Sequence, residues 1–135
     1  MLTGSVGSFT GGDEGEGLDL SGQFAYALNL GGPGGATAGN AMFTDGSNEG
    51  GTPGVVVVPT PSNQIPDWHA PEYGDSADDQ GLASAMQSIR WNVPPGLEVD
   101  LDVEAGQEYR LQLLFAESCC DRGFDISLEG EMVVD

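Results

Sequence analysis

The sequence has 135 residues, of which 22 are acidic and 3 are basic, so its formal net charge at neutral pH is −19. Nucleic acids and anionic membrane surfaces are bound by clustered Lys and Arg, and a chain with three arginines and no lysine is a poor match for either partner. No apolar run approaches the roughly 18 residues of a membrane span, so membrane insertion is not expected. The length predicts one domain, and 22 glycines with 8 prolines predict many turns and few long helices.

Residues 1–22 are mainly Gly, Ser, Thr and acidic residues, a composition that buries too little apolar surface to form a core. We therefore expect a flexible N-terminal arm over residues 1–22 and one domain over residues 23–135. The first residues lack the basic and apolar regions of a secretory signal, so either a signal has been removed or the chain is part of a longer protein. Strong acidity without lysine keeps a protein hydrated in high salt and favours an extracellular setting.

The first half of the domain contains one periodic segment and a long loop-rich region. Residues 24–30 place large apolar side chains on every second residue, which predicts a strand. Residues 31–80 are dominated by Gly, Asn, Asp, Ser and Pro, and long loops with aromatic residues are common binding surfaces. Residues 82–91 are compatible with a helix, but their aromatic end and the Pro-Pro pair that follows favour a strand for the second half.

The second half of the domain carries the strongest pattern, because aliphatic and acidic residues alternate strictly over residues 97–103. Residues 108–117 continue the alternation after a turn, and we expect the two segments to form an antiparallel hairpin. On the second strand the inward side chains are expected to be Tyr109, Leu111, Leu113 and Phe115. Residues 122–128 and 132–134 predict a second hairpin. The predicted fold is all-β, an antiparallel β-sandwich of the jelly-roll type.

Several of these segments resemble the malectin and malectin-like carbohydrate-binding family. The similarity is densest in residues 87–91, 104–117 and 122–130, and residues 26–32 and 40–45 resemble the opening strand and loop of that family. The resemblance implies a lectin-type β-sandwich that binds oligosaccharides outside the cell or in a secretory lumen, without catalysis. It also implies that further strands would follow Asp135, so the domain in this chain is expected to be truncated at its C-terminal end.

A sugar site needs flat apolar rings for the C–H face of the sugar, next to carboxylate or amide groups for its hydroxyls. Aromatic residues close to Asp or Asn supply this combination. Two of them, Phe43 and Trp91, have an alternative role as plugs at the ends of the sandwich, and Trp68 and Tyr73 have one in local loop packing. The candidate carbohydrate-binding residues are Asn40, Phe43, Asp45, Trp68, Tyr73 and Trp91.

Catalysis and metal binding are not expected. Glu117 and Asp125 could be compared with the paired carboxylates of glycosidases, but each can simply accept hydrogen bonds at a strand end. His69 is the only histidine, which argues against an imidazole metal cluster or proton relay, so we expect a solvated loop residue and no required cofactor. A structural Ca²⁺ ion is an alternative to solvated turns for two acidic clusters: Asp13, Glu14, Glu16 and Asp19, and Asp75, Asp78 and Asp79.

The adjacent cysteines Cys119 and Cys120 are not expected to pair with each other. Open interpretations are an intermolecular disulfide, a bridge to a further part of the chain, or one buried and one exposed thiol. Taken together, the sequence predicts a noncatalytic carbohydrate-binding module of a larger extracellular or secreted protein, with an oligosaccharide or a glycoprotein glycan as partner. The alternative is a structural assembly subunit that packs or polymerises with other protein chains and binds no sugar.

Overall fold

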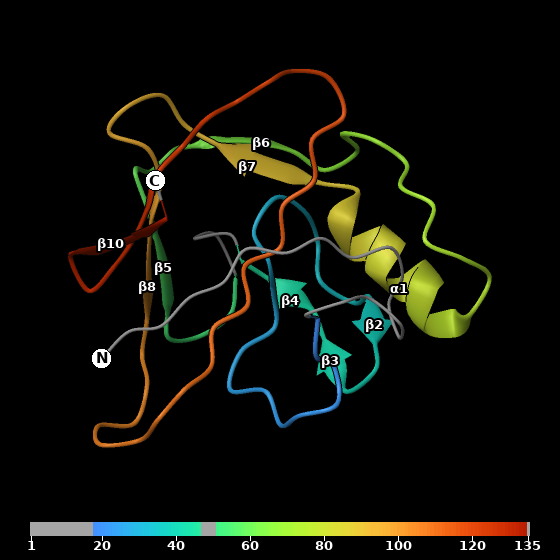
Figure 1. The fold of residues 1–135 in the computed structure, drawn as a ribbon, viewed down its shortest axis with the longest axis horizontal. Helices are drawn as coiled ribbons and strands as arrows, with labels where there is room; N and C mark the ends of the chain where they lie inside the picture. Colours follow the sequence, from blue (N-terminus) through green and yellow to red (C-terminus); the bar gives the residue numbers. More distant parts are fainter. Residues whose placement is uncertain (1–17, 47–50, 135) are drawn as a thin grey trace.

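The computed structural model describes residues 18–46 and 51–134, which form ten short strands and one helix (Figure 1). The strands pair two by two: β2 with β3, β5 with β8, β6 with β7 and β9 with β10 are antiparallel, and β1 with β4 is parallel. The described chain is therefore mostly β, as predicted, but it shows a helix and neither a closed barrel nor a clear sandwich. The elements are β1 (Leu28–Asn29), β2 (Thr37–Ala38), β3 (Ala41–Met42), β4 (Thr44–Asp45), β5 (Val55–Val58), β6 (Asn63–Ile65), α1 (Ala77–Met86), β7 (Ile89–Trp91), β8 (Glu98–Leu101), β9 (Ile126–Leu128) and β10 (Glu131–Val134).

Helix α1 begins where Ser76 and Asp79 form a capping box. The Ser76 hydroxyl accepts the Asp79 amide hydrogen at 3.0 Å, and the Asp79 carboxylate accepts the Ser76 amide hydrogen at 3.3 Å. The strand predicted for the second half of residues 82–91 is confirmed as β7, while the first half belongs to the helix. Within the described ranges, no helix has the length and apolarity that crossing a bilayer would require.

The hydrophobic core lies between α1 and the β2–β3 pair (Figure 1). Leu20 belongs to it and Leu18 packs against it, so these two residues of the predicted arm lie with the domain. The rest of the arm, residues 1–17, lies outside the described residues. The buried members of the core are Leu20, Ala38, Ala41, Phe43, Leu82, Ala85 and Met86.

The strand predicted over residues 97–103 is confirmed as β8, with Val99 and Leu101 half-buried and the acidic residues Glu98 and Asp100 exposed. Its predicted partner is wrong, because β8 pairs with β5, where Val57 lies opposite Val99. The physical reason is that β5 consists of four consecutive valines, whose branched side chains favour an extended backbone and offer a better apolar surface to β8. The strand predicted over residues 24–30 is reduced to β1.

Residues 108–117 pair with none of the described strands, and their predicted inward side chains instead face solvent. The exposed side chains are those of Tyr109, Leu111, Leu113 and Phe115. On the opposite face, Leu114 and Ala116 pack against the core. The Gln112 side chain on this face makes two hydrogen bonds with the Asp19 backbone, at 2.7 and 2.8 Å. The segment therefore alternates as predicted but with the two faces reversed.

The second predicted hairpin is confirmed as β9 and β10, which are antiparallel with Glu131 opposite Leu128. The two turn residues, Glu129 and Gly130, have φ of 50° and 81°. Positive φ at both central residues gives a two-residue turn whose twist matches the twist of the two flanking strands. This hairpin could be recognised from sequence because its turn and both strands are local.

Candidate functional site

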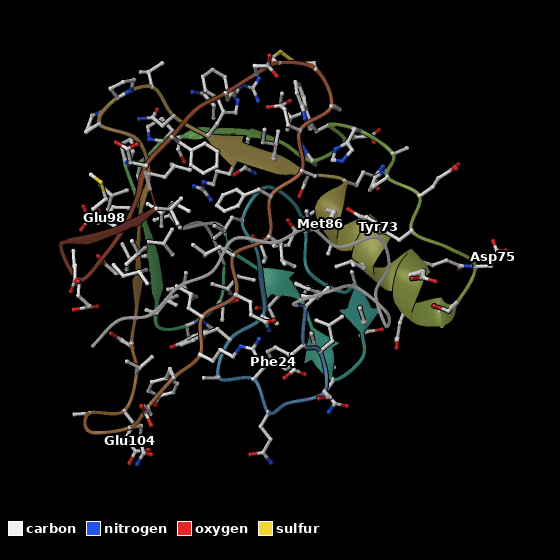
Figure 2. The ribbon with its side chains drawn as sticks, viewed as in Figure 1. Phe24, Tyr73, Asp75, Met86, Glu98 and Glu104 are labelled. Atoms are coloured by element: carbon white, nitrogen blue, oxygen red, sulfur yellow. A yellow bond between two sulfur atoms is a disulfide. The ribbon has the colours of Figure 1, made fainter. Side chains whose placement is uncertain are left out.

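An open groove of about 880 Å³ lies between residues 22–27, the β3–β4 region and the turn after β8. Figure 2 labels Phe24 and Glu104, which line it from separate segments. The groove combines aromatic rings with carboxylate and amide groups. Its principal aromatic and polar lining residues are Phe24, Tyr26, Tyr109, Asn40, Asp102 and Glu104.

Tyr26 joins the opening segment to the end of β8. Its hydroxyl donates a hydrogen bond to the carbonyl oxygen of Asp102 at 2.6 Å, and the Asp102 amide donates to the carbonyl of Gly54 at 2.8 Å. Gly54 has φ of 81°, and a Cβ there would lie 2.5 Å from the Tyr26 hydroxyl. Glycine at this position therefore leaves room for the Tyr26 ring in the groove wall.

Tyr109 follows the turn after β8 and is half-exposed at the groove. Its hydroxyl accepts the amide hydrogen of Glu104 at 3.1 Å, so the ring is tied back to the turn that carries Glu104. The side chains of Asp102 and Glu104 are exposed on the same turn. Both residues line the groove, as do Tyr26 and Tyr109.

The strand side of the groove is built from small polar groups. The Thr44 amide donates to the Ala27 carbonyl at 2.8 Å, and the hydroxyls of Thr44 and Thr52 lie 2.6 Å apart. Asn40 donates from its side-chain nitrogen to the carbonyls of Ser21 and Gly22. These contacts hold the opening segment against β3 and β4 and leave a surface of hydroxyl and amide groups.

The groove is suited to binding a neutral, hydroxyl-rich ligand. Aromatic rings pack against the C–H face of a sugar, and carboxylate and amide groups accept or donate to its hydroxyls. Among the described residues that line the groove there is no His, Cys, Lys, Arg or Ser. The lining residues therefore offer no cationic side chain to an anionic ligand.

Of the six residues predicted to bind carbohydrate, only Asn40 lines this groove. Phe43 is buried in the core, so its ring is not presented to a ligand. Asp45 lies in β4 near Arg90, whose guanidinium donates to the Ser62 hydroxyl at 2.7 Å. Partial burial lowers the pKa of Arg90, and the negative charge of Asp45 opposes that shift.

The three remaining predicted residues lie on other parts of the surface. Trp68 is half-buried beneath Arg122, whose guanidinium carbon is 5.4 Å from the ring centroid. Tyr73 packs against the core beside Met86 (Figure 2), and burial raises the pKa of its phenol. Trp91 is exposed at the end of β7, opposite Asn63. The six residues are thus not brought together into one site.

The expectation that Cys119 and Cys120 do not pair with each other is wrong. Cys119 and Cys120 are joined to each other by a disulfide, so neither thiol is left for an intermolecular bridge in this form. The Glu117 carboxylate accepts the amide hydrogens of Ser118 and Cys119 and pairs with Arg122 at 2.7 Å. The Cys119 amide hydrogen bond and the Arg122 charge lower the pKa of Glu117. Through these contacts Glu117 joins the backbone of the loop to the side chain of Arg122.

Three of the acidic residues considered for Ca²⁺, Asp19, Asp78 and Asp79, accept hydrogen bonds from nearby amide or hydroxyl groups. Asp79 caps α1, Asp78 accepts the Gly39 amide hydrogen at 2.8 Å, and Asp19 accepts from Ser21. The hydrogen bonds from Ser21 lower the pKa of Asp19. Other than Glu117 with the two bridged cysteines, the described residues gather no three potential metal ligands. Asp75 is exposed in the loop before α1, and the other three acidic residues of that prediction, Asp13, Glu14 and Glu16, lie outside the described residues.

No known protein family, curated protein or solved structure matches this chain. The candidate site is therefore defined by its geometry, and most of it was missed from sequence. Phe24 and Tyr26 were assigned to the apolar face of a strand, and Tyr109 to the interior. A usable signal was that a tyrosine hydroxyl needs a polar partner, which places such rings at the surface near polar turns such as residues 102–107.

Proposed function

We propose that the protein is a noncatalytic carbohydrate-binding module that holds an oligosaccharide or a glycoprotein glycan in the groove. One observation carries the proposal: the aromatic residues Tyr26 and Tyr109 line a single open groove together with the acidic residues Asp102 and Glu104. An open groove accommodates an extended chain of sugar units better than a small compact molecule.

Two further features support this function. The net charge of −19 disfavours anionic ligands, while neutral hydroxyl groups can donate to carboxylates. The motifs that resemble the malectin-like family also favour a lectin-type β-sandwich within a larger protein, located outside the cell or in a secretory lumen. The outward orientation of Tyr109, Leu111, Leu113 and Phe115 removes the support that their alternation gave to the sandwich, so the groove is the stronger argument.

The test is glycan-array screening followed by titration of the bound glycan. Asp102→Asn and Tyr109→Ala should each weaken binding by about tenfold or more, because each removes one contact of roughly 1.4 kcal/mol or more. Asp100→Asn is the matched control, since Asp100 is an exposed aspartate of β8, two residues before Asp102, and does not line the groove. Trp91→Ala should bind normally. Absence of any glycan ligand, or loss of binding in Trp91→Ala with normal binding in Asp102→Asn, would contradict the proposal.

A second candidate function, an assembly subunit, is favoured by one specific observation. Four consecutive outward side chains of residues 108–117 are large and apolar, and a soluble domain seldom exposes such a row without a partner. In that function the chain docks with another protein through this row. Binding of a protein partner without any glycan ligand would favour this function over the first.

A further inference from the structure

A continuous apolar surface runs along residues 109–115 and reaches the start of the C-terminal hairpin. We call it the outer strip, and its members are between 45% and 57% exposed. Phe115 and Phe124 extend it across two segments, with ring centroids 4.8 Å apart and ring planes inclined by 49°. The outer strip consists of Tyr109, Leu111, Leu113, Phe115 and Phe124.

The segment that carries the outer strip is fixed on its opposite face. Gln112 is bonded to the Asp19 backbone, and Leu114 and Ala116 pack against the core. The outward orientation of Leu111 and Leu113 therefore follows from how this segment is anchored. In Figure 1 the segment follows the turn after β8 and carries no strand arrow.

The backbone of this segment is available for pairing. Among the described residues, 111–117 make no backbone–backbone hydrogen bond and belong to no strand pair. The amide hydrogens of Ser118 and Cys119, just beyond the segment, are already accepted by Glu117. An extended segment with unpaired backbone groups is a template for an added strand from another chain.

The area of the outer strip indicates what kind of partner it fits. Five large side chains that are each about half-exposed present roughly 400–500 Å², the size of a surface patch that often has a function. Two copies packed through this strip would bury about 1,000 Å² in total, the lower limit for a specific interface. Each copy also carries a charge of −19, so a second copy of this chain is opposed by electrostatic repulsion.

The charge instead favours a basic partner. Arg110 and Arg122 are paired with Asp19 and Glu117, and the third arginine, Arg90, is half-buried. The chain as a whole carries a net charge of −19, which attracts a partner rich in Lys and Arg. We propose that residues 109–117 bind an extended segment of a partner protein in which apolar residues alternate with Lys or Arg. Its backbone pairs with residues 111–117 and its apolar residues cover the outer strip.

This inference rests on the second candidate function and shares only Tyr109 with the glycan groove. The test uses a fluorescent peptide that alternates valine with lysine, with two comparison peptides: valine with glutamate, and serine with lysine. Binding to the full chain is followed by fluorescence anisotropy, and backbone pairing by amide hydrogen exchange of residues 111–117. The double variant Leu111→Asn/Leu113→Asn removes apolar surface without changing charge, and Val56→Asn is the control at an exposed valine of β5.

The valine–lysine peptide should bind the native chain and the Val56→Asn variant equally, and the double variant at least about tenfold more weakly. Its affinity should fall when NaCl is raised from about 0.05 to about 0.5 M, because salt screens the attraction. Exchange of the amides of residues 111–117 should slow in the complex. Neither comparison peptide should bind comparably.

Three results would overturn the inference. Equal binding of the serine–lysine peptide, or unchanged binding to the double variant, would show attraction by charge alone. No binding of the valine–lysine peptide would remove the proposed partner. A dimer in sedimentation velocity that the double variant abolishes would assign the strip to a second copy. Glycan binding should persist in the double variant, so failure here is separate from failure of the groove proposal.

Discussion

Substituting Gly81 by alanine tests how closely α1 approaches β2. A Cβ built on Gly81 would lie 1.6 Å from the Thr37 carbonyl oxygen and 2.6 Å from its carbonyl carbon, where ordinary contacts are 3.4–4 Å. The obstacle is backbone, so it cannot rotate away as a side chain would. The helix would have to move by nearly 2 Å away from β2, as estimated from the difference between these distances.

Two effects of this substitution oppose each other, and their magnitudes decide the outcome. Alanine favours a helix interior over glycine by about 1 kcal/mol. Overpacking a well-packed interface costs about 1–3 kcal/mol and occasionally more. Here the displacement also opens the core between Leu82 and Ala38, both of which are 0% exposed. We expect the collision to exceed the propensity gain, with a net loss of about 2 kcal/mol in the free energy of unfolding.

The measurement is urea denaturation followed by far-UV circular dichroism. Ser84 lies in the same helix and is exposed, so Ser84→Gly and Ser84→Ala together measure the glycine-to-alanine preference of α1 without any collision. Ser84→Ala should be the more stable of the two by about 1 kcal/mol. If the Gly81→Ala variant is as stable as the native chain, or more stable, then α1 does not approach β2 as closely as these distances indicate.

Three further predictions concern single side chains. Asn29→Ala should lower the free energy of unfolding by about 2–3 kcal/mol in urea denaturation, because the buried Asn29 oxygen accepts two glycine amides and the Ser88 hydroxyl; an unchanged midpoint would contradict this. Ser76→Ala should cost about 1 kcal/mol through loss of the helix cap, and Ser76→Asp should restore most of it. The pKa of Glu117 is lowered in the fold, so its ionised form stabilises the fold at pH values above the ordinary pKa of glutamate. This contribution is lost as the pH falls through the lower pKa of the folded state. Glu117→Gln should therefore be less stable than the native chain at neutral pH, with a difference that narrows on acidification; a difference independent of pH would refute this role.

The elements that could be predicted from sequence are those specified by neighbouring residues. The alternation over residues 97–103 fixes both the strand and its exposed face, because the apolar and acidic sets are cleanly separated. The β9–β10 hairpin is also local, with Gly130 at a turn position of positive φ. In both cases no distant part of the chain is needed to decide the structure.

The pairing of strands and the choice of which face is buried were not predictable, because both depend on residues far away in the sequence. The choice of β5 as the partner of β8 depends on residues more than forty positions earlier, and the sequence-adjacent segment 108–117 was the simpler expectation. That segment carries apolar residues on both faces. Its smaller face, with Leu114 and Ala116, fits against the core, while the larger face remains exposed. Alternation alone indicates an extended backbone but does not indicate which face is covered.

The candidate site was predicted poorly because it is assembled from segments far apart in the sequence. Tyr26 and Asp102 meet through one hydrogen bond across 76 positions, and no local pattern indicates this contact. Asn40 was found because an amide in a loop next to an aromatic residue is a local signal. Trp68 and Trp91 gave the same signal but pack elsewhere, which shows that aromatic residues near polar ones identify candidates without placing them together.

The groove and the outer strip meet at Tyr109, which belongs to both. Its hydroxyl is held by the Glu104 amide, so the ring cannot turn toward one surface without breaking that hydrogen bond. A sugar that stacks on Tyr109 would cover the first ring of the strip and leave Leu111, Leu113 and Phe115 exposed. A partner strand that begins at Leu111 can therefore bind beside an occupied groove, whereas one that also covers Tyr109 must compete with the sugar. Peptide titrations with and without saturating glycan separate these two arrangements, because only the second weakens peptide binding.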